Sequence, residues 1–177
     1  MRKSQERILY DDLIAQGATL VAAMGNARAA GSPPSYPAAL PGVVAVGAVG
    51  LDDRVAPFSS RGRHIALSAP GVSIWSTLPN YAGQIGFHPR RGVRGAPRVG
   101  AAMPRNTGGD AWPGTSMATP HVTAAAALLL ANRGAMSGSE VRQALMKSAG
   151  RLAGMKRNRW TPDHGAGMLD LAKLLAP

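Results

Sequence analysis

The sequence lacks cysteine, has few aromatic residues and contains no long apolar run. Without cysteine, neither a disulfide bond nor a thiolate metal site can form. Aromatic residues make up 5% of the 177 residues and hydrophobic residues 45%, so Ala, Val, Leu and Met must build the interior. The apolar stretch at 122–131 is too short to cross a bilayer, which requires about 20 apolar residues. These features predict one domain's worth of chain with no membrane span.

Acidic residues are missing from the middle of the chain, where residues 54–109 contain eight Arg and no Asp or Glu. The formal net charge is +11, which raises the hypothesis of nucleic-acid binding. No nucleic-acid-binding motif accompanies this charge, and a basic loop is more often a solvated surface. We therefore predict no nucleic-acid partner and an irregular, basic, Gly/Pro-rich insertion at about 80–113. Its basic residues are Arg90, Arg91, Arg94, Arg98 and Arg105.

The N-terminal residues 1–7 are charged, and no apolar stretch follows them. A signal peptide requires such a stretch, so we predict none in this chain. The absence of cysteine does not decide the compartment either, because oxidising and reducing compartments both hold proteins without cysteine. The sequence therefore predicts no localisation.

The chain contains short apolar runs bounded by Gly and Pro, with helical patterns before and after them. The runs at 18–24, 43–49 and 65–69 have the length and composition of strands that are buried on both faces of a parallel sheet. Helical patterns, one of them opened by a capping box, lie at 6–16, 116–132, 137–147 and 168–175. The predicted fold class is α/β, a parallel sheet with flanking helices.

The block 114–122, Gly-Thr-Ser-Met-Ala-Thr-Pro-His-Val, places a hydroxyl between a glycine turn and the start of an apolar helix. Unpaired backbone N–H groups and the helix dipole favour negative charge at a helix N-terminus. Ser116 is therefore expected where the oxyanion of an acyl-transfer reaction can be stabilised. A serine at this place is also a common N-cap, and the block alone leaves both roles open.

Other motifs precede this block at spaced positions. Residues 20–26, Leu-Val-Ala-Ala-Met-Gly-Asn, form an apolar run that ends in Gly-Asn, and further motifs follow at 36–37, 44–48, 58–60 and 69–71. With its motifs in this order, the chain from about Asp11 to Leu175 resembles the second half of the catalytic domain of the subtilisin-type serine proteases, or subtilases. The resemblance implies a subtilisin-like fold that is incomplete, with its N-terminal strands missing.

The resemblance implies a serine endopeptidase that hydrolyses bonds in peptide or protein substrates. Ser116 matches the family's nucleophile, and Asn26 matches the asparagine that donates to the oxyanion. An asparagine in a Gly-Asn pair is also a common turn residue, which is the alternative role for Asn26. No cofactor is implied. None of the family's calcium sites is carried over, because their loops are not recognisable here.

The family's catalytic Asp lies in an Asp-x-Gly motif and its catalytic His in a His-Gly-Thr-His motif, both ahead of the Gly-Asn segment. Only about twenty residues precede that segment here, and neither motif lies among them. None of the four histidines, at 64, 88, 121 and 164, has the required neighbours. We therefore predict a fragment that is inactive alone, with a missing N-terminal half as a candidate partner. The alternative is a non-catalytic subtilase-derived protein that binds peptides or partners.

Overall fold

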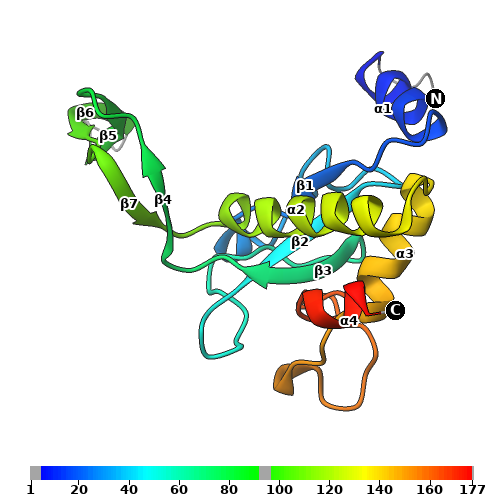
Figure 1. The fold of residues 1–177 in the computed structure, drawn as a ribbon. Coiled ribbons are helices and arrows are strands. Elements are labelled where there is room, and N and C mark those ends of the chain that lie inside the picture. The colour runs from blue at the N-terminus through cyan, green and yellow to red at the C-terminus, as the bar shows by residue number, and fades with distance from the viewer. Residues whose placement is uncertain (1–4, 92–96, 177) are drawn as a thin grey trace. The chain divides into compact units, whose positions relative to one another are not determined.

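The residues that the structure describes, 5–91 and 97–176, divide into two units (Figure 1). The structure is a computed structural model. The first unit contains the chain up to Ser73 and again from Pro113 onward, and the second unit is the segment Ile74–Trp112. Asn26 and Ser116 therefore both belong to the first unit.

The first unit is built on a parallel sheet of three strands in the order β1-β2-β3. These strands are β1 (Val21–Ala23), β2 (Val44–Val49) and β3 (Ile65–Pro70). Every residue of β2 is buried, as expected for the central strand of a sheet that is covered on both faces. Within the described sheet β1 pairs only with β2 and is an edge strand. The predicted strands, their parallel pairing and the α/β fold class are confirmed.

Helices pack against this sheet and against one another. The helix α2 (Thr115–Arg133) contacts all three strands, and α3 (Gly138–Ser148) contacts β3 and α2. The predicted capping box opens α3, since the Ser137 hydroxyl accepts from the Glu140 N–H and the Glu140 carboxylate accepts from the Ser137 N–H. The other helices are α1 (Gln5–Ala15), η1 (Arg28–Ala30), η3 (Ala153–Met155) and α4 (Leu171–Leu175). None of the described helices has the length and apolar character needed to cross a membrane.

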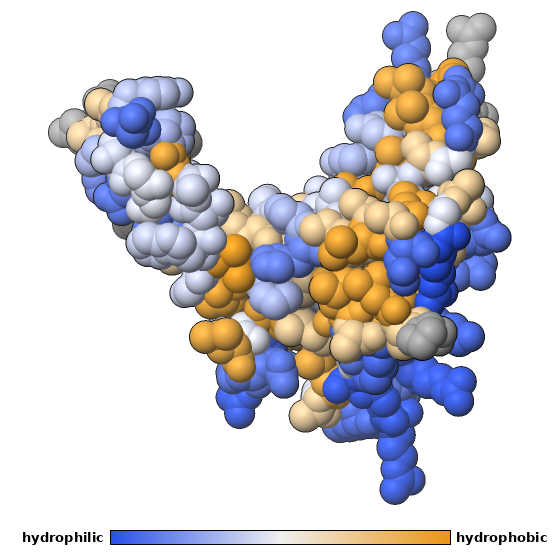
Figure 2. All heavy atoms as spheres, in the orientation of Figure 1, coloured by the Kyte–Doolittle hydropathy of each residue, from blue (hydrophilic) through white to orange (hydrophobic). Residues whose placement is uncertain are grey.

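One face of α2 packs on the sheet, and the opposite face is open to solvent. The buried residues of the packed face include Ala118, Val122, Ala125, Ala126 and Leu129. The run 124–127 is apolar all round, which predicts burial inside a larger domain, and within the described residues Ala124 and Ala127 are exposed. Leu128 beside them is 47% exposed. Hydrophobic side chains reach the surface of this unit (Figure 2), so the part of the chain that the structure describes leaves an apolar stripe of α2 uncovered.

The second unit consists of two antiparallel strand pairs. β4 (Ile74–Leu78) pairs with β7 (Gly108–Trp112), and β5 (Gln84–Arg91), which contains His88, pairs with β6 (Pro97–Pro104). The prediction that the segment at about 80–113 is irregular is therefore wrong. Arg94 lies outside the described residues.

The strands of the second unit could not be predicted from the sequence, because Gly and Pro interrupt the alternation of apolar and polar residues. Pro97 and Pro104 stand at the two ends of β6, and the register of β5 shifts between Phe87 and Pro89. At strand ends and register shifts the missing N–H group of proline is tolerated. Pairing with a partner strand, rather than local alternation, therefore determines the structure of this segment.

Candidate active site

Ser116 occupies the second position of α2, directly after the N-cap Gly114 and the first helical residue, Thr115. Gly114 has φ 155° and ψ 155°, a backbone conformation that is essentially confined to glycine. The Ser116 side chain is exposed, whereas the preceding Thr115 is only 1% exposed. The predicted place of Ser116 at a helix N-terminus is confirmed.

Ser116 does not cap this helix. The N-cap is Gly114, which has no side chain to accept a hydrogen bond, so the alternative role of Ser116 as N-cap is wrong. Pro120 lies one turn further on and has no N–H group, so it cannot donate to the Ser116 carbonyl as a helical residue normally does. The Ser116 hydroxyl lies in the N-terminal turn, where the helix dipole favours negative charge. The Thr115, Met117 and Ala118 N–H groups of this turn already donate to Asn26 or Gly114.

Asn26 is bound to the residue that precedes Ser116. Its Oδ1 atom accepts from the Thr115 backbone N–H at 3.0 Å and from the Thr115 hydroxyl at 2.9 Å. The Thr115 hydroxyl oxygen in turn accepts from the Gly25 N–H at 3.1 Å. A backbone N–H can only donate, so the atom of Asn26 that faces Thr115 must be the amide oxygen. These contacts turn the Asn26 NH₂ group, with its two donor hydrogens, away from Thr115.

The Asn26 amide and the Ser116 backbone nitrogen border one space beside Gly114. The point that a Cβ atom of Gly114 would occupy is 3.2 Å from Met117 Sδ, 3.4 Å from Asn26 Nδ2 and 3.7 Å from Ser116 N. The Asn26 amide nitrogen and the Ser116 nitrogen are therefore neighbours beside Gly114, as two donors to one oxygen atom must be. The structure thus brings the two site residues predicted from the sequence, Ser116 and Asn26, into one site.

Thr115 is a site residue that the sequence patterns missed. It is buried, and besides its contacts with Asn26 its carbonyl accepts from the Thr119 hydroxyl at 2.8 Å. The only signal in the sequence is a hydroxyl residue between Gly114 and Ser116. Its partner Asn26 lies 89 positions earlier, which no local pattern reveals.

None of the histidines described in the first unit forms a hydrogen bond with Ser116. His121 Nδ1 lies 3.1 Å from the carbonyl oxygen of Met117, one helical turn earlier. His64 Nε2 is buried without a partner among the described residues, and burial lowers the pKa of His64. That none of these histidines is the base for Ser116 stays a prediction. No group of three His, Cys, Asp or Glu in the described part of the chain could hold a metal ion.

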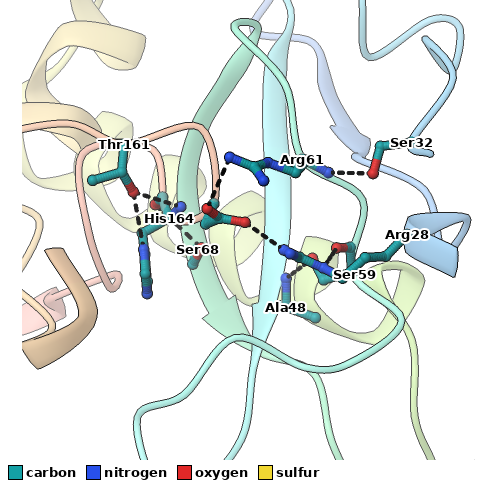
Figure 3. A network of polar contacts seen from close by, with 9 residues as sticks. Arg28, Ser32, Ala48, Ser59, Arg61, Ser68, Thr161 and His164 are labelled. Carbon is teal, nitrogen blue, oxygen red and sulfur yellow. Dashed lines mark hydrogen bonds and ion pairs between the residues drawn. The ribbon is translucent and has the colours of Figure 1, made fainter.

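His164 belongs to a network that links the C-terminal loop to the sheet (Figure 3). Its Nδ1 atom lies 2.9 Å from the Thr161 hydroxyl, and its carbonyl accepts from the Ser68 hydroxyl at 3.2 Å. Burial lowers the pKa of His164, while the Asp163 carboxylate raises it and Arg28 lowers it to smaller extents. The folded protein therefore binds a proton at this position more weakly than the unfolded chain does.

We expect the free energy of unfolding to fall as the pH drops below about 6.5, the ordinary pKa of histidine. Below that pH the unfolded chain takes up a proton that the buried His164 resists, so acid favours unfolding. His164→Gln should lose this part of the pH dependence when chemical denaturation is compared at about pH 7.5 and about pH 5.5. His64→Gln should remove only the separate contribution of His64, whose pKa is also lowered. An unchanged pH dependence in His164→Gln would show that His164 is not the group responsible.

Comparison with known proteins identifies the family. The sequence profile of the Subtilase family matches residues 3–168. Subtilisin E from Bacillus subtilis is 37% identical over 145 residues, which cover 81% of this chain and 31% of that protein. Fervidolysin from Fervidobacterium pennivorans is 35% identical over 167 residues, which cover 92% of this chain and 22% of fervidolysin. This chain therefore spans less than a third of the length of either relative.

Comparison of the fold with solved structures identifies the same family. The crystal structure of fervidolysin, a keratinolytic enzyme related to subtilisin, matches with a TM-score of 0.75 at 31% identity. The match covers 99% of this chain and 25% of the fervidolysin chain. Because the family profile and the fold match both extend over most of its length, the chain belongs to the Subtilase family.

Proposed function

We propose that this chain carries the nucleophile and the oxyanion donors of a serine endopeptidase. In this proposal the Ser116 hydroxyl attacks the carbonyl carbon of a peptide bond, and the Asn26 NH₂ group and the Ser116 backbone N–H bind the resulting oxyanion. The observation that carries the proposal is that both donors border the space beside Gly114. The substrates are peptides or proteins.

The contacts with Thr115 would prepare Asn26 for this role before any substrate binds. Both hydrogen bonds engage the amide oxygen, so the amide cannot rotate without breaking them. Donors that are already fixed need no reorganisation when negative charge develops in the transition state. The exposed side chains of Asn26 and Ser116 are also accessible to a substrate.

A serine hydroxyl needs a base to accept its proton, and in our proposal that base lies outside these 177 residues. The family's Asp and His motifs would come from a further segment, either joined to this chain or present as a separate polypeptide. The uncovered stripe of α2, which includes Ala124 and Leu128, and the edge strand β1 offer surfaces on which such a segment can pack. Apolar surface and unpaired strand edges both favour association.

A second candidate function is that of a non-catalytic subtilase-derived protein that binds a peptide or a partner. One observation favours it, since no histidine described in the first unit forms a hydrogen bond with Ser116. The two candidates differ in activity once the missing motifs are supplied. The peptidase gains activity, whereas a binding protein does not.

The proposal is tested in a complemented protein, in which a segment with the family's Asp-x-Gly and His-Gly-Thr-His motifs precedes this chain. Asn26→Asp keeps an oxygen for Thr115 but replaces the NH₂ donors by a second acceptor. We expect kcat for a peptide substrate to fall about 10²–10³-fold with little change in KM, the size already measured for loss of the corresponding donor in subtilisin. Asn132→Asp, at an exposed position near the other end of α2, is the matched control and should leave kcat unchanged. Equal rates in the two variants would rule out an oxyanion role for Asn26.

A further inference from the structure

The backbone on both sides of Asn26 is bound to the segment that follows β2. The Gly25 carbonyl accepts from the Ser60 N–H at 2.9 Å, and the Ala27 N–H donates to the Ser60 hydroxyl at 2.9 Å. Gly25 itself has φ +102°, a turn conformation that favours glycine. Ser60 thus holds the turn that carries Asn26 from both sides.

Arg28, two residues after Asn26, connects the same turn to Asp163, which is distant in the sequence. Its Nε atom donates to the Ser59 carbonyl at 2.7 Å, and its Nη2 atom lies 2.7 Å from Asp163 Oδ1. Arg61 approaches the same carboxylate, with 3.5 Å between its Nη2 atom and Asp163 Oδ2 (Figure 3). The Arg28 and Asp163 side chains are each 27% exposed, compared with 53% for Arg61. The Arg28–Asp163 pair is therefore the closer and better buried of the two ion pairs.

Asp163 stands on a tight turn that lies against β3. The Gly165 N–H donates to the Thr161 carbonyl at 2.8 Å and closes the turn around Asp163. Gly165 has φ +61° and lies so close to the Ala66 carbonyl that no Cβ atom would fit. The Asp163 carboxylate is therefore a fixed point to which Arg28 can anchor the turn at Asn26.

We infer that Arg28 and Asp163 are positioning residues for the Asn26 amide, an inference that rests on the proposed function of Asn26. Thr115 fixes the amide oxygen, and the Arg28–Asp163 bridge fixes the turn from which the Asn26 side chain projects. Neither residue touches the reacting atoms. Their role is to keep the NH₂ group aimed at the space beside Gly114, where the oxyanion would form. The two residues are 135 positions apart, so no local pattern pairs them.

Side-chain amide NMR of the 177-residue chain tests this inference without requiring catalysis. Asn26→Asp identifies the Asn26 NH₂ signals by their loss. Arg28→Gln and Asp163→Asn should each shift these signals toward those of a freely mobile Asn side chain, because the turn that carries Asn26 is held less firmly without the bridge. Arg61→Gln removes the other guanidinium from the same carboxylate and is the matched control, which should leave the Asn26 signals in place.

A double variant shows whether Arg28 and Asp163 affect the Asn26 signals through one shared ion pair or independently of each other. If Arg28 and Asp163 act through a single bridge, Arg28→Gln/Asp163→Asn should shift the Asn26 signals no more than either single variant does. The Trp160 indole N–H, which donates to the Ile65 carbonyl at 3.0 Å, reports the intact fold, and its signal should remain present in every variant.

Unmoved Asn26 signals, additive effects in the double variant, or an equal effect of Arg61→Gln would each overturn the inference. If one single variant fails to fold, the other is used for the test, because either substitution alone removes the Arg28–Asp163 ion pair. Loss of the Trp160 signal in both single variants would show that the ion pair is needed for folding, and this would also overturn the inference. The NMR result does not depend on catalysis, so a failed peptidase assay would count against the proposed function and not against the bridge.

Discussion

We expect Ser116→Ala to lower kcat of the complemented protein by about 10⁶ with little change in KM, because in the proposed function the Ser116 oxygen is the atom that forms the acyl bond. The size is the known effect of losing the nucleophile in subtilisin, a relative of this chain, and is not calculated from the present geometry. The oxyanion donors and the substrate contacts remain in the variant, so a small residual rate above that of water is expected. Steady-state kinetics with a chromogenic peptide measure both parameters.

Ser139 offers a matched control for this substitution. Like Ser116 it is exposed at the second position of a helix, but its helix is α3 and its hydroxyl lies 3.0 Å from that of Ser137. Ser139→Ala should leave kcat unchanged. A wild-type rate in Ser116→Ala would exclude Ser116 as the nucleophile, and an equal loss in both variants would point to a folding defect instead.

The 177-residue chain by itself should hydrolyse peptides about 10⁶-fold more slowly than the complemented protein, the scale known for loss of the triad in subtilisin. In the proposed function the chain alone has no base for Ser116, so the hydroxyl stays protonated and is a weak nucleophile. The donors beside Gly114 remain, but they act only once a tetrahedral oxyanion has formed. The rate of the chain alone is compared with that of the complemented protein at equal concentration. Comparable rates would show that this chain contains its own base.

The sheet and the main helices could be predicted from local patterns because burial imposes those patterns. A strand that is covered on both faces reads as a continuous apolar run, as β2 does, and a capping box marks the start of α3. The second unit could not be predicted in this way. Its strands are defined by pairing across a hairpin, and Gly and Pro hide their alternation.

The candidate site likewise contains residues that local motifs indicate and residues that only the structure reveals. Ser116 and Asn26 each stand in a short motif at the end of an element, so the sequence indicates both. Thr115 and the Arg28–Asp163 bridge became visible only in the structure, because their contacts join segments 89 and 135 positions apart. Such contacts leave no periodicity and no motif in the sequence. Residues that hold a site in place are therefore harder to predict than residues that perform its chemistry.

Labelling with a fluorophosphonate probe tests most directly whether Ser116 is a nucleophile that depends on a base outside this chain. The probe bonds to an activated serine, and mass spectrometry locates the modified residue. We expect stoichiometric labelling at Ser116 in the complemented protein, and none in its Ser116→Ala variant or in the 177-residue chain alone. Stoichiometric labelling of the chain alone that disappears in Ser116→Ala would contradict the proposed dependence on an external base.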